Sequence, residues 1–186
     1  MRTLTTVTLT LVVLAVGGLL FAVSGVYDMG ADAPHWPVTY RLMAGVRDRS
    51  IAHASAEIAV PGFSNRTQFL KGAGHYAAMC AGCHLSPGDS NSDLRAGLYP
   101  QPPNLSTVLI PPAQAFWAIK HGIKMSAMPA WGASHDDATI WSMVSFLQTL
   151  PTLSAEQYRK IVAEAPPDED MDMKMDGESP TGHSGH

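Results

Sequence analysis

Cys80-Ala81-Gly82-Cys83-His84 is the stretch that decides the fold of this 186-residue chain, and it contains both of its cysteines. Two thiols separated by two residues and followed by a histidine match the signature for covalent attachment of a c-type haem. The thiols add to the two vinyl groups of one haem, and the adjacent imidazole reaches the iron from the same side. A zinc site would need two further ligands of similar geometry. The motif therefore predicts one haem c, attached at Cys80 and Cys83 and ligated by His84.

The sequence around this motif resembles the single-haem class I cytochromes c over roughly residues 65–150. As in that family, Gly72 lies eight residues before Cys80 and Tyr76 lies four residues before it. This spacing places the three residues on one face of a helix. The resemblance implies an all-α fold, with three to five helices around one covalent haem. It also points to a membrane-tethered bacterial c-type cytochrome as the kind of protein.

A second helix is expected at residues 137–150, where apolar residues recur at helical spacing. Ser134 is a candidate for its N-cap, and Pro151 should end it. In the family, such a C-terminal helix crosses the helix before the motif, and an aromatic ring rests on the glycine. The resemblance assigns that ring to Phe146 or Trp141.

The resemblance also implies the axial ligands of the iron and the residue that orients the histidine, through two further segments. Pro102-Pro103-Asn104-Leu105 resembles the Pro-Asn-Leu of the family, in which the proline carbonyl accepts a hydrogen bond from the haem-binding histidine. Transferred here, Pro103 orients His84. The run from Met128 to Gly132 resembles the family's axial methionine segment, which makes Met128 the expected sixth ligand. Met125, three residues earlier, is the alternative ligand.

Several shorter signals predict local structure. Pro111 and Pro112 suit the first turn of a helix that ends at Gly122, and another short helix is expected near Asp93. His75 and His135 are expected at the surface, together with His121 at a helix end, where histidines usually satisfy the last carbonyls.

The N-terminal segment, residues 1–27, contains an apolar run from Leu9 to Val26 that is interrupted only by Thr10 and Ser24. As a helix it would rise about 27 Å, close to the roughly 30 Å hydrocarbon core of a bilayer. Two interpretations are open. An uncleaved transmembrane anchor would hold the remainder on the extracytoplasmic side, whereas a cleaved signal peptide would release a soluble periplasmic protein.

The rest of the chain divides into three parts by composition. Residues 28–60 are expected to form a juxtamembrane helical segment, and residues 61–165 the cytochrome c domain. Residues 166–186 carry one basic and six acidic residues, with almost no large apolar side chains, and are expected to be a disordered tail. The net charge of −4 argues against a nucleic-acid partner.

Electron transfer is the leading functional hypothesis, because an iron with histidine and methionine on both axial sites has no open position for a substrate. The protein would pass single electrons between membrane or periplasmic redox partners, as a carrier rather than an enzyme, or as the cytochrome subunit of an oxidoreductase. A labile methionine would instead permit a haem sensor or peroxidase. Thioether and imidazole side chains in the tail suggest copper binding or copper delivery as an accessory role. The candidate copper ligands are Met171, Met173, Met175, His183 and His186.

Overall fold

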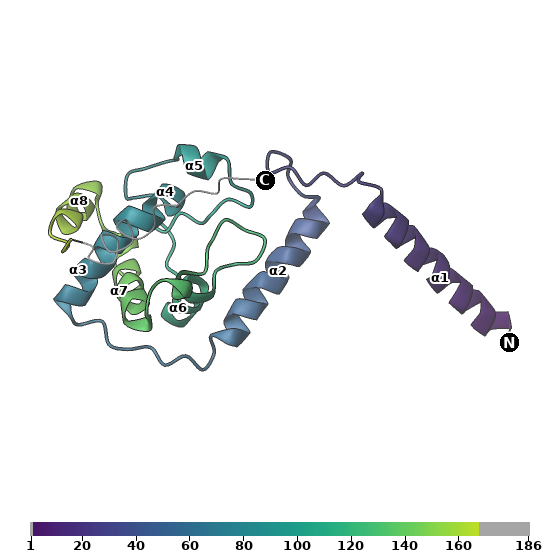
Figure 1. Ribbon diagram of the computed structural model, residues 1–186, viewed down its shortest axis with the longest axis horizontal. Coiled ribbons are helices and arrows are strands. Elements are labelled where there is room, and N and C mark those ends of the chain that lie inside the picture. The colour runs from purple at the N-terminus through teal and green to yellow at the C-terminus, as the bar shows by residue number, and fades with distance from the viewer. Residues whose placement is uncertain (1, 168–186) are drawn as a thin grey trace, which may run out of the picture. The chain divides into compact units, whose positions relative to one another are not determined.

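The computed structural model describes residues 2–167, and every regular element within them is helical (Figure 1). No strand occurs in this part of the chain, which confirms the predicted all-α class. The chain divides into two compact units, one up to Met43 and one from Ala44 onward, which we describe separately. The elements are α1 (Arg2–Val23), α2 (Pro37–Ala54), α3 (Arg66–His75), η1 (Tyr76–Cys80), α4 (Ala81–His84), α5 (Asp93–Ala96), α6 (Pro112–His121), η2 (Trp131–Ala133), α7 (Asp137–Leu147), η3 (Leu150–Thr152) and α8 (Ala155–Ala163).

The first unit is built around α1, whose length and apolar composition suffice to cross a membrane and equally fit a signal sequence. The chain after it brings aromatic side chains together: the ring of Trp36 lies 5.9 Å from that of Phe21 and 5.2 Å from that of Tyr27. The Tyr27 hydroxyl also lies 3.0 Å from Nδ1 of His35. We call these four residues the aromatic cluster. It connects the last turn of α1 to the segment that leads into α2.

The core of the second unit depends on the crossing of α3 and α7, which pack closely although they are about 70 residues apart in sequence (Figure 1). Gly72 sits at the crossing point, where a Cβ would overlap the carbonyl oxygen of Ser142 and lie 2.5 Å from its carbonyl carbon. The prediction of an aromatic ring on Gly72 is therefore wrong: the backbone of α7 occupies that space. Only glycine permits this distance between the helices.

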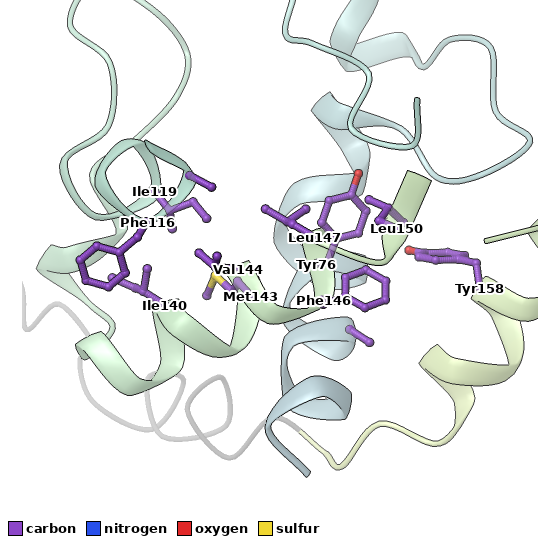
Figure 2. Close-up of a cluster of buried hydrophobic side chains, with 12 residues drawn as sticks. Tyr76, Phe116, Ile119, Ile140, Met143, Val144, Phe146, Leu147, Leu150 and Tyr158 are labelled. Atoms are coloured by element: carbon purple, nitrogen blue, oxygen red, sulfur yellow. The ribbon is translucent and has the colours of Figure 1, made fainter. Parts of the chain in front are cut away.

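Phe146 instead packs beside the glycine contact, between Tyr76 and Tyr158 (Figure 2). Its ring centroid lies 5.5 Å from that of Tyr76 and 6.2 Å from that of Tyr158. Trp141 stacks on Phe116 of α6 at 4.2 Å. Aromatic rings thus join α7 to η1, α6 and α8. The buried core consists of Ala73, Tyr76, Ala115, Phe116, Ile119, Ile140, Met143, Val144, Phe146, Leu147, Leu150 and Tyr158.

The ends of α7 differ from the prediction. Its N-cap is Asp136, whose carboxylate accepts the backbone N–H of Thr139 at 2.8 Å, and Ser134 lies two residues before this cap. The hydrogen bonds that Asp136 accepts from the backbone N–H and the hydroxyl of Thr139 hold the pKa of its carboxyl below the ordinary value. The helix ends at Leu147, before Pro151, which lies within the 3₁₀ turn η3.

Other local predictions are confirmed. Helix α6 begins at Pro112 and is followed by Gly122 at φ 65°, and α5 begins at Asp93. Helix α2 covers part of residues 28–60, for which a juxtamembrane position stays a prediction. The sequence reasoning did not anticipate α8, although Ser154 and Gln157 form a reciprocal capping box at its start.

Candidate haem-binding site

The attachment motif follows a change in helix geometry. Helix α3 passes into the π-helical turn η1, which ends at Cys80, and Cys83 and His84 follow in the single turn of α4. A π-turn inserts one extra residue per turn and so re-aims the side chains after it. Both cysteines are partly exposed free thiols. Burial, together with the neighbouring Cys83, raises the pKa of the Cys80 thiol to about 12.

Tyr76 holds the C-terminal end of this motif through its hydroxyl group. Its buried hydroxyl donates to the carbonyl oxygen of Leu85 at 2.6 Å and lies 3.3 Å from that of His84. Burial, the largest cause, raises the pKa of this hydroxyl above its ordinary value, so it remains a donor. The His84 carbonyl also accepts the backbone N–H of Leu105 at 3.1 Å. The turn that carries the histidine is thus held from two sides.

The His84 side chain is oriented by Pro103. Its Nδ1 lies 2.9 Å from the Pro103 carbonyl oxygen, and because a carbonyl can only accept, Nδ1 carries the hydrogen. Burial, the largest cause, lowers the pKa of His84; the Arg95 charge acts in the same direction, and the Pro103 hydrogen bond opposes both. The imidazole is therefore neutral near pH 7, with the lone pair of Nε2 free to bind a metal.

Met128 and Met125 occupy different surroundings. Met128 is partly buried against the hydrophobic core, whereas Met125 is 84% exposed with φ 55°. The Met128 carbonyl accepts the N–H of Ile123 at 3.1 Å, which closes the loop back onto the end of α6. At that point a Cβ on Gly122 would lie only 2.7–2.8 Å from the backbone of residues 128–130. The close approach of this glycine fixes the backbone that carries Met128.

The remaining candidate residues lie elsewhere. His75, expected at the surface, is 2% exposed, and its ring lies 5.5 Å from that of His135. This expectation is wrong because His75 lies on α3, which packs closely against α7 in the core of the second unit, and its polar side chain is buried there. His121 is exposed and lies beside Trp117 at 5.0 Å. The candidate copper ligands, Met171 to His186, lie outside the described residues.

The donor set present fits a haem better than a bare metal ion. Among residues 2–167, no group of three or more His, Cys, Asp or Glu side chains could hold a metal ion. The motif offers two unpaired thiols and one neutral imidazole with a free Nε2, which are the groups that covalent attachment and axial ligation of a haem need.

In the comparison with protein families, residues 67–147 match the model described as "Cytochrome C oxidase, cbb3-type, subunit III". Comparison with curated proteins and with solved structures gives no match. The matched range begins in α3 and ends with α7, so it contains the helix crossing, the attachment motif and the loop of Met128. Residues 67–147 of this helical chain are therefore similar to a c-type cytochrome family, whose members carry a covalent haem c.

Proposed function

We propose that the protein is a membrane-anchored single-electron carrier whose haem is attached at Cys80 and Cys83 and ligated by His84 and Met128. The observation that carries this proposal is the hydrogen bond from His84 Nδ1 to the Pro103 carbonyl. This bond fixes the tautomer and direction of the imidazole before any ligand is bound. It leaves Nε2 as the donor atom for the iron.

The chain supplies the second axial ligand from the closed loop after α6. The thioether of Met128 is a soft ligand that stabilises ferrous haem and raises its reduction potential. The partial burial of Met128 supports its choice over Met125, whose side chain is almost entirely in solvent. When bound, the haem supplies a one-electron couple. With both axial positions filled by the protein, electron transfer is favoured over binding of oxygen or peroxide.

The aromatic cluster supports retention of α1 as an anchor. Trp and Tyr are enriched at the membrane–water interface, and here Tyr27 and Trp36 pack against Phe21 at the end of the apolar helix. Cleavage after Ser24 would separate Phe21 from its two partners. If the N-terminus of α1 stays in the cytoplasm, the anchor places the haem domain on the extracytoplasmic side, where c-type haem is attached.

The partners we propose are redox proteins in or at the same membrane. The matching family model is described as an oxidase subunit, which supports an electron acceptor of the terminal oxidase kind. An anchor confines the search for such a partner to the membrane plane and raises its effective concentration.

Optical spectra of the full-length protein purified from membranes test the proposal. The ferric form should show the weak long-wavelength band of thioether ligation, and the ferrous form should not react with carbon monoxide. Rapid carbon monoxide binding would contradict the carrier function and favour a haem sensor or peroxidase. The absence of covalently bound haem would contradict the attachment site itself.

A further inference from the structure

A chain of hydrogen bonds connects the attachment motif to helix α5. The hydroxyl of Ser92 donates to the carbonyl oxygen of Gly82, inside the motif, and accepts the backbone N–H of Arg95 at 3.1 Å. Ser92 is also the N-cap of α5. The position of Arg95 is thereby set relative to the two cysteines that flank Gly82.

The side chain of Arg95 continues this chain to the proline pair. Its Nη2 donates to the Pro102 carbonyl at 3.2 Å, and the next carbonyl, that of Pro103, accepts from His84 at 2.9 Å. The hydrogen bonds therefore form a closed path from the motif through Ser92 and Arg95 back to the histidine. Arg95 is the link between the two halves of this path.

One donor of Arg95 has no acceptor in the described part of the chain. Its Nε is buried and makes no hydrogen bond there. A buried N–H without an acceptor is unfavourable, so an acceptor from outside the polypeptide is expected. A guanidinium binds carboxylates most strongly, because its planar fork matches their geometry. A haem held by the adjacent motif brings two carboxylates, its propionates.

We propose that Arg95 is a positioning residue that donates Nε–H to a haem propionate while its Nη2 holds Pro102. This inference rests on the proposed attachment of haem at Cys80, Cys83 and His84. The arginine neutralises a propionate charge that would otherwise favour ferric iron, so it raises the reduction potential. It also keeps the proline pair in place behind the histidine.

The test is a spectroelectrochemical titration of full-length haem-loaded Arg95→Gln. At the wild-type midpoint potential, we expect the ratio of ferrous to ferric haem to fall about tenfold, which corresponds to a decrease of about 59 mV. Arg95→Lys keeps the charge but lacks the Nε–H, so its ratio should fall only two- to fivefold. Arg159→Gln removes an exposed arginine of α8 and should change the ratio less than twofold.

The outcomes separate this proposal from the function on which it rests. A wild-type protein without covalent haem or axial thioether would overturn the proposed function. An unchanged midpoint in Arg95→Gln, in a protein that keeps the thioether band, would overturn the role of Arg95 alone. If Arg95→Gln does not accumulate with haem, Arg95→Lys decides: a two- to fivefold fall supports the proposal, and an unchanged midpoint overturns it.

Discussion

Met128 and Met125 stand three residues apart, but only Met128 packs against the core. Replacement of Met128 by alanine should remove the thioether and open the sixth coordination position. We expect the ferrous Met128→Ala protein to bind carbon monoxide. Its ratio of ferrous to ferric haem at the wild-type midpoint should fall at least tenfold, about 59 mV. Absorption spectra with and without carbon monoxide, combined with a redox titration, measure both effects.

Met125→Ala is the matched control for that experiment, because it removes a thioether from the same loop without touching the core. Its spectrum and midpoint should equal those of the wild type. The opposite result, with carbon monoxide binding in Met125→Ala and none in Met128→Ala, would transfer the ligand role to Met125.

The residues of the site were accessible to sequence reasoning to different degrees. The spacing of Cys80, Cys83 and His84 is local and carries its own chemical explanation. The contact between His84 and Pro103 joins residues 19 positions apart, and only the family resemblance suggested it. Nothing in the sequence pointed to Arg95, since an arginine in a short loop helix is usually solvated. Its buried Nε becomes visible only when Pro102 and Ser92 are placed around it.

At the scale of elements, the crossing of α3 and α7 depends on Gly72. Replacement of Gly72 by alanine should push the helices apart, because its Cβ would overlap the Ser142 carbonyl in a rigid backbone. We expect the free energy of unfolding to fall by about 3 kcal/mol or more. Chemical denaturation followed by circular dichroism measures the loss.

Gly45→Ala in α2 provides the comparison, since a Cβ there meets nothing within 4 Å. That variant should be neutral or slightly more stable, because alanine is the better helix former. Equal stability of the Gly72→Ala and Gly45→Ala proteins would show that the helices do not cross as closely as described.

The N-cap of α7 gives a prediction with a pH dependence. Asp136→Ala should lower the free energy of unfolding at pH 7 by about 1 kcal/mol, because the N–H of Thr139 loses its acceptor. The pKa of Asp136 is lowered in the folded protein. The contribution of ionised Asp136 to the free energy of unfolding is therefore present above the ordinary carboxyl pKa. It is lost as pH falls through the pKa of Asp136 in the folded protein.

Asp136→Asn separates the cap from the charge, since asparagine is also a good N-cap residue. The stabilisation that the asparagine cap gives relative to Asp136→Ala should be the same at pH 7 and pH 3, whereas the stabilisation from aspartate should be smaller at pH 3. A wild-type advantage over Asp136→Ala that is equal at both pH values would contradict the ionised cap.

The sequence predicted the ends of a helix where a single residue type, such as proline or glycine, begins or ends the helix by itself. Prolines at the start and glycine after the end define α6 in both prediction and structure. The true cap of α7 was missed because Ser134 and Asp136 are both good cap residues, and only packing chooses between them. The sequence reasoning did not predict the π-turn η1, which begins at Tyr76.

At the scale of the whole molecule, the aromatic cluster predicts that α1 stays attached. Protein purified from membranes should have an intact mass that includes the residues before Ser24, and washing at alkaline pH should not release it. The expected cause is the apolar length of α1, which exceeds that of a usual signal-peptide core. A mature N-terminus at or after Gly25, with the protein in the soluble fraction, would contradict the anchor.

The crossing at Gly72 also has a consequence for the order of events as the chain is made. The partner of α3 is α7, which lies about 70 residues later, so α3 cannot bury its inner face until residue 147 has emerged. Contacts between distant segments form late in folding. We therefore expect the stretch between these helices to stay open until then, with both of its thiols within reach of the apparatus that attaches haem. On this expectation, the helix crossing limits the time in which the cofactor can be attached.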